Sequence, residues 1–266
     1  GKSGALVCDD GAMTTPREQA RIRTTAEIER LAWEHLERHG AAALSLRAIA
    51  RDLGMVSSAI YRYIPSRDDL LTLLITEGYR DLADAVDTAL DSLAARDRDA
   101  DGRARWLTAS HALRTWALAR PAAWSLLYGS PVPGYAAPDE ATTPQGTRVV
   151  LRLGAILAEA SARGEVDAVV GPLANAATLT PALAQSLSEL GSDLGQGIGP
   201  SAVAQVVCGW TALLGAVSAE VFGQLGRDPF AAPHDFAEIA LASICDAVGL
   251  RAGPHSPGSG RAVLTP

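Results

Sequence analysis

Apolar residues in the early part of this chain recur at the spacing of an α-helix. A stripe at i, i+3, i+4 and i+8 indicates a first helix from Arg17 to Gly40, and its members are Ile28, Leu31, Ala32 and Leu36. A shorter helix follows, because Ser45 can cap its N-terminus and Gly54 can end it. Its apolar positions are Leu46, Ile49, Ala50 and Leu53. The pattern therefore predicts two amphipathic helices of unequal length.

Two further helices are predicted before residue 100. A short segment over 57–63 is closed by a proline soon after its end. Ser66 can cap the next helix, whose first turn carries Asp68 and Asp69 beside the positive end of the helix dipole. This longer helix continues toward Leu93.

The rest of the chain also has helical spacing, with interruptions. Helices are predicted over 106–118, from Pro121, and over 147–162, 201–225 and 234–248. The interruptions are a charged junction over 96–105, a loop rich in proline and glycine over 129–146, and the stretch 163–200, which fits no single element. Disordered tails are expected over 1–16 and 251–266. No run alternates with a period of two, so the pattern predicts an all-α protein.

The second and third predicted helices have the arrangement of a helix-turn-helix. They are short, they are separated by Gly54, and together they span about 20 residues. In that motif the first helix crosses the DNA backbone and the second lies in the major groove. DNA binding is the function that this pattern indicates.

The string from Ser45 to Leu71 resembles the N-terminal domain of the TetR family of transcriptional regulators. The positions that carry the resemblance are Ser45, Ile49, Ala50, Gly54, Tyr61 and Pro65-Ser66-Arg67. The resemblance implies a three-helix helix-turn-helix domain over 17–80 and a larger helical domain for ligand binding and dimerisation over 81–250. It implies a homodimer on a double-stranded palindromic operator, most simply a repressor that a small hydrophobic effector releases.

Two positions depart from the family pattern. Val56 stands where the family usually has a serine that caps the recognition helix, so that capping moves to Ser57 or the helix begins elsewhere. Arg67 replaces the usual lysine, which keeps the charge and adds a guanidinium fork that suits phosphate.

The candidate DNA contacts combine arginines, hydroxyl groups and small residues at the front of the recognition helix. They are Arg47, Ser57, Ser58, Ala59, Tyr61, Arg62, Tyr63 and Arg67. Arginine recognises guanine and phosphate, tyrosine hydroxyls suit phosphate oxygens, and small residues let the helix approach base edges. Two simpler alternatives remain: Arg47 is a solvated surface side chain, and Tyr61 packs against the first helix.

The charge balance seems at first to oppose DNA binding. The 266 residues carry 23 basic and 30 acidic residues, a net charge of −7, and Lys2 is the only lysine. Residues 17–80, however, hold ten arginines against nine acidic residues, whereas 81–266 hold 12 basic and 19 acidic residues. The acidity therefore lies outside the predicted DNA-binding domain.

The C-terminal part holds the candidates for dimerisation and ligand binding. The helices near 201–225 and 234–249 are the predicted dimer contacts; Gly209 and Gly215 would allow close helix approach, and Cys208 and Cys245 are interpreted as small core residues. Aromatic residues gather just before the loop 129–146, and the candidate ligand contacts there are His111, Trp116, Trp124 and Tyr128. The alternative for each of these four is an ordinary place in the core.

Other classes of protein find little support in the sequence. No catalytic motif, cofactor motif or metal-ligand spacing is present, and Gly195, Gly197 and Gly199 form only a weak imitation of a phosphate loop. Three widely spaced cysteines support no disulfide framework, and the first 20 residues do not read as a signal peptide. We expect a cytoplasmic protein with no membrane contact, not an enzyme. A TetR-fold regulator or adaptor without an effector pocket remains an alternative.

Overall fold

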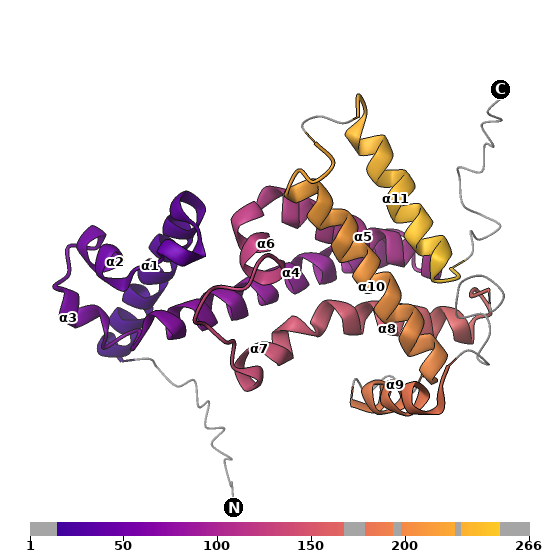
Figure 1. The fold of residues 1–266 in the computed structure, drawn as a ribbon, viewed down its shortest axis with the longest axis horizontal. Coiled ribbons are helices and arrows are strands. Elements are labelled where there is room, and N and C mark those ends of the chain that lie inside the picture. The colour runs from indigo at the N-terminus through magenta and orange to yellow at the C-terminus, as the bar shows by residue number, and fades with distance from the viewer. Residues whose placement is uncertain (1–14, 168–178, 194–197, 227–229, 251–266) are drawn as a thin grey trace, which may run out of the picture. The chain divides into compact units, whose positions relative to one another are not determined.

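The computed structural model describes residues 15–167, 179–193, 198–226 and 230–250 (Figure 1). Over these residues the chain is helical, and its one β-bridge is an isolated pair between Val166 and Leu250. The elements are α1 (Pro16–His39), η1 (Ala41–Ala43), α2 (Leu46–Asp52), α3 (Ser57–Ile60), α4 (Arg67–Arg96), α5 (Gly102–Ala119), α6 (Pro121–Tyr128), α7 (Asp139–Gly146), α8 (Arg148–Ala162), α9 (Pro181–Asp193), α10 (Pro200–Val221) and α11 (Pro233–Ala247). The all-α prediction is confirmed.

The chain divides into two compact units, 1–74 and 75–266, and the division falls inside α4. In the first unit α1 packs against η1 and α2, and α2 packs against α3. Its core is apolar and fully buried, with members Ile28, Ala32, Ile49, Ala50 and Ile60. The amphipathic stripes found in the sequence therefore face one another.

The helix starts in the first unit follow their capping residues. The Thr15 hydroxyl accepts the N–H of Glu18, so α1 already begins at Pro16, the last residue of the expected tail. Ser45 caps α2 by accepting the N–H of Ala48. Ser66 caps α4, since its hydroxyl oxygen accepts the Asp69 N–H at 3.1 Å, and the hydroxyl group donates to Asp69 Oδ2 at 2.7 Å.

The second unit is arranged around α10, which contacts α5, α6, α8, α9 and α11 (Figure 1). Large, fully buried side chains there lie on α4, α5, α6, α8 and α10, and include Leu82, Trp106, Trp124, Ile156 and Leu213. Burial of each such side chain stabilises the fold by about 1.5–3 kcal/mol. The core of this unit is thus a layer of large apolar side chains beneath α10.

Three predictions for the second unit were wrong in their boundaries. The charged junction 96–105 is partly helical, because the Asp101 carboxylate accepts the N–H of Ala104 at 2.7 Å and starts α5 at Gly102. Residues 139–146 of the expected loop form α7, which packs on α8 despite Pro144 inside it. Residues 181–193, for which no element was predicted, form α9. The glycines at 195 and 197 and the tail 251–266 lie outside the described residues.

The two cysteines of the described residues differ in environment. Cys245 is fully buried on α11, and this burial raises the pKa of its thiol to about 12. Cys208 is exposed on α10, so its interpretation as a core residue was wrong. It lies on the side of α10 that faces away from the helix's neighbours.

The two glycines singled out on α10 have different roles within the chain. A Cβ on Gly209 would lie 2.5 Å from Val248 Cγ1 and 3.1 Å from Trp106 Cζ2, so no other residue fits there without displacement. A Cβ on Gly215 would meet nothing within 4 Å. Gly209 therefore permits a close approach inside the unit, and Gly215 does not.

This contrast gives a paired test of stability. We expect Gly209→Ala to lower the free energy of unfolding by about 1–2 kcal/mol, because overpacking outweighs the gain in helix propensity. Gly215→Ala, the matched control on the same helix, should be neutral or stabilising by about 0.5–1 kcal/mol. Urea denaturation followed by circular dichroism measures both. Equal stability of the two variants would show that the close packing at Gly209 is wrong.

Candidate DNA-binding surface and ligand domain

The turn between α2 and α3 depends on a backbone conformation that favours glycine. Gly54 has a φ of 67°, in the left-handed region, while a Cβ there would meet nothing within 4 Å. The requirement is therefore conformational rather than steric. The Met55 N–H donates to the Ala50 carbonyl at 2.8 Å and closes the turn. This geometry directs the chain from α2 into α3.

The recognition helix α3 begins without a side-chain cap. Val56 occupies the N-cap, where its side chain makes no capping bond, and Ser57 is the first helical residue. The alternative in which Ser57 takes over capping is wrong. Val56 is also 72% exposed, so the front of α3 presents an isopropyl group next to the exposed Ser57 and Ser58.

Most of the predicted DNA contacts are accessible. Arg47, Ser57, Ser58, Tyr61 and Arg62 are exposed, and of these Tyr61 keeps 41% of its surface in solvent. Ala59 and Tyr63 are half-buried, which suits residues that pack and still reach the surface. These seven residues lie on α2, on α3 and in the turn after α3. The accessibility satisfies a condition for DNA contact, and the contacts themselves remain predictions.

Arg67, the eighth predicted contact, is already engaged within its own unit. Its Nη2 donates to the Ala41 carbonyl at 2.9 Å and to the Ala42 carbonyl at 3.3 Å, and its Nε donates to the Leu44 carbonyl at 3.2 Å. The guanidinium thereby donates to carbonyl groups at η1 and just after it, in addition to the Leu44 N–H that donates to the Ala41 carbonyl. Arg67 ties the start of α4 to the segment that precedes α2.

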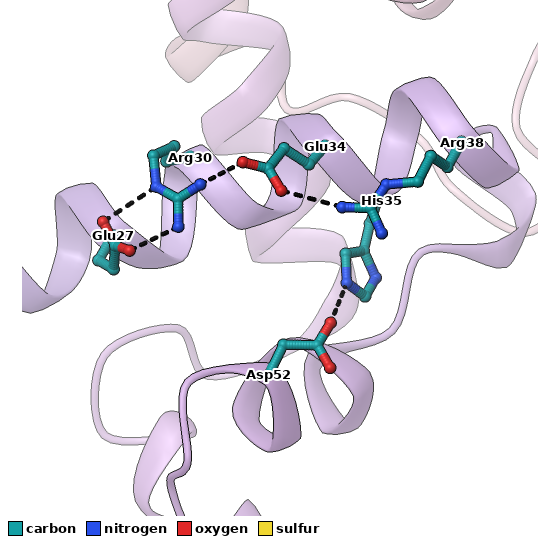
Figure 2. A network of polar contacts seen from close by, with 6 residues as sticks. All are labelled: Glu27, Arg30, Glu34, His35, Arg38 and Asp52. Atoms are coloured by element: carbon teal, nitrogen blue, oxygen red, sulfur yellow. Dashed lines mark hydrogen bonds and ion pairs between the residues drawn. The ribbon is translucent and has the colours of Figure 1, made fainter.

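A buried histidine joins α1 to α2, a feature that the sequence reasoning missed. Figure 2 shows the network around it, whose members are Glu27, Arg30, Glu34, His35, Arg38 and Asp52. His35 is 6% exposed, and its Nε2 lies 2.6 Å from Asp52 Oδ2, at the end of α2. The sequence did indicate that His35 is buried, because it falls seven residues after Ile28 on the apolar stripe of α1. The pairing fixes the C-terminal end of α2 against α1.

The remaining members of the network lie along the exposed side of α1. Arg30 bonds to Glu27, at 3.1 Å for Nε, and to Glu34, which also accepts from Arg38 at 2.9 Å. The hydrogen bond from Arg30 lowers the pKa of Glu27. Because these pairs are exposed, solvent screening limits what they add to stability. They support the helix on the side away from its core.

The four predicted ligand contacts are engaged in packing and polar contacts of the second unit. Trp124 is fully buried and its Nε1 donates to Ser218 Oγ at 3.1 Å, whereas Trp116 is 6% exposed and its Nε1 donates to Asp81 Oδ2 at 2.8 Å. Both indole N–H groups therefore have partners in the protein.

Tyr128 and His111 are less deeply enclosed. The Tyr128 ring lies against Trp124, with the ring centres 4.6 Å apart, and burial raises the pKa of its hydroxyl. His111 Nε2 lies 3.3 Å from Glu238 Oε2, which links α5 to α11. The structure thus brings Trp124 and Tyr128 together and gives each of the four a place in the fold. Their role as ligand contacts remains a prediction.

A cavity of about 350 Å³ lies elsewhere in the second unit, between α5, α10 and α11. Apolar side chains make up most of its described lining, and Arg114 and Glu220 are the charged residues there. Arg114 Nε donates to Glu220 Oε2 at 2.7 Å, and Nη2 bonds to the other oxygen. None of the four predicted ligand contacts is among the residues that line this cavity. Sequence reasoning missed it because its walls come from segments about 100 residues apart.

Metal and membrane sites were also considered over the part of the chain that the structure describes. No group of three or more histidine, cysteine or acidic side chains there could hold a metal ion. By length and composition α10 is apolar enough to cross a membrane, with a mean hydropathy of 1.6 over 18 residues, of which 33% are buried. One such helix is weak evidence, because helices in the core of other folds pass the same test.

Comparison with known proteins follows the same division of the chain. Residues 28–74 match the family model for bacterial regulatory proteins of the tetR family, and residues 106–244 match the model for the tetracyclin repressor-like C-terminal domain. The HTH-type transcriptional regulator Rv1816 of Mycobacterium tuberculosis (strain ATCC 25618 / H37Rv) is 42% identical over 221 residues, 82% of this chain and 88% of that protein. The HTH-type transcriptional regulator Mb1846 of Mycobacterium bovis (strain ATCC BAA-935 / AF2122/97) has the same identity and coverage.

A solved structure extends the likeness to the fold. The crystal structure of a regulatory protein, SCO4313, has a TM-score of 0.66 and 33% sequence identity, and the match covers 87% of this chain and 100% of that one. With the helix-turn-helix geometry of α2 and α3, and with family models matching both units, the chain belongs to the TetR family of bacterial transcriptional regulators.

Proposed function

We propose that this protein is a ligand-responsive repressor that binds a palindromic operator as a homodimer and is released by a small hydrophobic effector. The observation that carries the proposal is the α2–turn–α3 unit, whose outward residues include the accessible polar side chains of Arg47, Ser57 and Tyr61. Each copy presents one recognition helix, and helix-turn-helix dimers read two half-sites about 34–36 Å apart. A two-fold partner is therefore part of the proposal, and operator binding makes it a cytoplasmic protein.

On the operator, Arg47 and Arg62 supply the positive charge, and Tyr61 and Tyr63 supply hydroxyl groups for phosphate. Arginine makes the bidentate contacts to guanine that give direct readout, whereas tyrosine contacts position the protein on the backbone. Ser57, the first residue of α3, is small enough to let the helix end approach base edges. Because the sequence has almost no lysine, phosphate contacts fall to arginine.

The exposed sides of α10 and α11 support dimerisation through these two helices. Ile239 on α11 is 64% exposed, the highest value among the large apolar side chains in the described part of the second unit. On α10 the outward positions include Cys208 and Ala212, and residues 201–219 carry no acidic or basic side chain. An apolar face of this kind on a folded unit indicates a protein contact. Dimerisation also explains why an apolar helix such as α10 is only one-third buried within one copy.

Effector release requires a difference in affinity between two conformations. An effector that binds the conformer with wrongly spaced recognition helices shifts the population away from DNA binding, with a coupling of about 1–3 kcal/mol in typical cases. The aromatic residues Trp116, Trp124 and Tyr128, together with His111, remain the sequence-based candidates for effector contact.

Replacement of Arg47 or Tyr61 tests the DNA-binding surface. We expect Arg47→Ala to weaken operator binding by about 1–3 kcal/mol, because a charged, bidentate contact is lost. Tyr61→Phe should weaken it by less and reduce binding to all sequences alike, because its hydroxyl meets phosphate. Fluorescence anisotropy with an operator obtained by selection from a random library measures both effects over a salt series.

The matched control is Arg98→Ala, which removes one exposed arginine from the second unit. It should leave operator affinity unchanged. If Arg47→Ala binds as tightly as the unaltered protein, Arg47 is a solvated side chain and the contact assignment is wrong. If selection yields no preferred site at all, the regulator function itself is wrong.

Dimerisation through α10 and α11 has its own test. Ile239→Glu should place a charge in the contact between copies and raise the dimer dissociation constant by at least about 100-fold, since an uncompensated buried charge costs about 3–5 kcal/mol. Leu183→Glu is the matched control, because Leu183 is 48% exposed on α9, outside the proposed contact. Sedimentation velocity should show monomers for the first variant and dimers for the second. A dimeric Ile239→Glu protein would exclude this face as the contact.

A further inference from the structure

The cavity between α5, α10 and α11 has the size of a small-molecule site. Its volume of about 350 Å³ falls within the range of roughly 300–1,000 Å³ seen for ligand pockets. We propose that it binds a neutral, mainly apolar small molecule whose single hydrogen-bond acceptor takes an N–H of Arg114. The assignment of the cavity as a ligand-binding site is independent of the function proposed above. Its role as the effector site of the regulator rests on that function.

Small residues leave the space that a ligand would occupy. Gly215, Ala219 and Ala240 lie on the wall, where longer side chains would fill the volume. A Cβ on Gly215 meets nothing within 4 Å, which confirms open space at that point. The cavity therefore exists because the residues at these positions of α10 and α11 are small. Larger side chains on the same backbone would fill it.

The larger lining side chains are apolar and provide a flat surface. Phe230 and Phe236 stack with their ring centres 4.1 Å apart and their planes 19° apart. Leu225 and Leu241 also line the cavity. Burial of an aliphatic chain or a ring against such walls is favourable, whereas a strongly hydrated group would lose its water without gaining polar contacts from them.

The cavity is held in shape by polar contacts between its helices. The Arg114–Glu220 pair joins α5 to α10, and the His111–Glu238 contact joins α5 to α11. Glu220 takes two of the five N–H groups of the Arg114 guanidinium. The remaining donors can serve a ligand without breaking the pair. Because the walls are fixed before a ligand arrives, binding costs little ordering.

The charge of the lining selects the class of ligand. Among the described residues that line the cavity, Arg114 and Glu220 are the charged ones, and as a pair they are neutral. The Arg114 side chain is 14% exposed and that of Glu220 is 31% exposed, so both act in an environment of reduced solvent screening. A carboxylate would be attracted to Arg114 and repelled by Glu220, whereas a ketone, ester or alcohol meets only the donor. The site therefore favours a neutral acceptor.

A side chain from a second copy is the competing occupant. The cavity adjoins the exposed face of α11, where side chains of a second copy could also pack, since helices that pack across a face set the ridges of one into the grooves of the other. The ion pair on its wall, however, favours a ligand with a polar group over an aliphatic side chain. If a partner's side chain fills the cavity, the dimer will not bind the probe used below.

The binding experiment uses the full chain and 1-aminoanthracene, a neutral, planar fluorophore whose emission rises in apolar surroundings. Decan-2-one and decanoate, which have equal chain lengths, then compete for the probe at about pH 8. We expect the ketone to displace the probe at an about tenfold lower concentration than the carboxylate. Failure of the probe to bind, or a preference for decanoate, would overturn the proposal.

Glu220→Gln tests the part played by the ion pair. Removal of the carboxylate leaves Arg114 with an unpaired charge, so the preference should reverse and decanoate should displace the probe better than decan-2-one. The matched control is Glu159→Gln, because Glu159 pairs with Arg105 of the same helix α5 but does not line this cavity. That variant should keep the preference for the ketone. An unchanged preference in Glu220→Gln would show that the acceptor does not meet Arg114.

A second pair of variants does not depend on the ion pair. Gly215→Phe should place a ring in the cavity and weaken probe binding at least about tenfold. Ala182→Phe, on the exposed surface of α9 and outside both the cavity lining and the proposed dimer contact, should leave probe binding unchanged. Circular dichroism and sedimentation on both variants check that the fold and the dimer persist. Equal probe affinity in the two variants would place the probe elsewhere.

Operator release separates this proposal from the function proposed above. Decan-2-one, added to the protein on its selected operator, should lower operator affinity in the unaltered protein and not in Gly215→Phe. If decan-2-one binds but leaves operator affinity unchanged, the site stands and its effector role fails. If operator binding is selective but no compound binds, the regulator stands and the site fails.

Discussion

At Gly209 the backbone of α10 comes against the indole of Trp106 and the side chain of Val248, and the second unit is packed around this contact. Helix α10 touches five other helices, so its distance from α5 and α11 affects each of them in turn. Protein interiors are close-packed and do not deform smoothly, and a single methyl group at this contact has no space. The same closeness leaves the opposite side of α10 to solvent or to a partner.

The DNA-binding unit depends on constraints of another kind. Helices α2 and α3 are too short to be stable alone, since isolated helices below about 12–15 residues are marginal in water. They are held by burial against α1, by the left-handed turn at Gly54, and by two polar ties, the His35–Asp52 contact and the bonds of Arg67 to carbonyl groups. Each tie connects residues 17 or more positions apart in the chain. A rigid presentation of α3 is what readout of base edges requires.

Local signals in the sequence predicted much of this fold. The caps at Ser45 and Ser66 and the first-turn proline at Pro121 act within a few residues, so their effect can be read without the tertiary structure. The cap at Asp101 was equally local, but it was hidden in a charged stretch that resembled a solvated linker. Helix α7 was missed because Pro144 is normally a helix breaker, and packing on α8 overrides that preference.

Features that depend on distant residues could not be predicted. The indole N–H of Trp124 meets Ser218, 94 residues away, and that of Trp116 meets Asp81, 35 residues away. A cluster of aromatic residues in the sequence therefore does not reveal whether the rings face a ligand or one another. The cavity wall likewise combines Arg114 with residues of α10 and α11, and only the folded chain brings them together. The eight candidate DNA contacts were easier to name, because a short motif contains them.

The contrast between the two cysteines of the second unit gives the protein an internal reporter. Burial and the raised pKa make the Cys245 thiol unreactive, whereas Cys208 stands exposed in the middle of α10. With Cys8 replaced by serine, the rate of alkylation would report the solvent access of one point on α10. If the alkylation rate of that thiol fell as the protein concentration rose, the fall would measure how far a second copy covers α10. No added fluorophore or spin label would be needed.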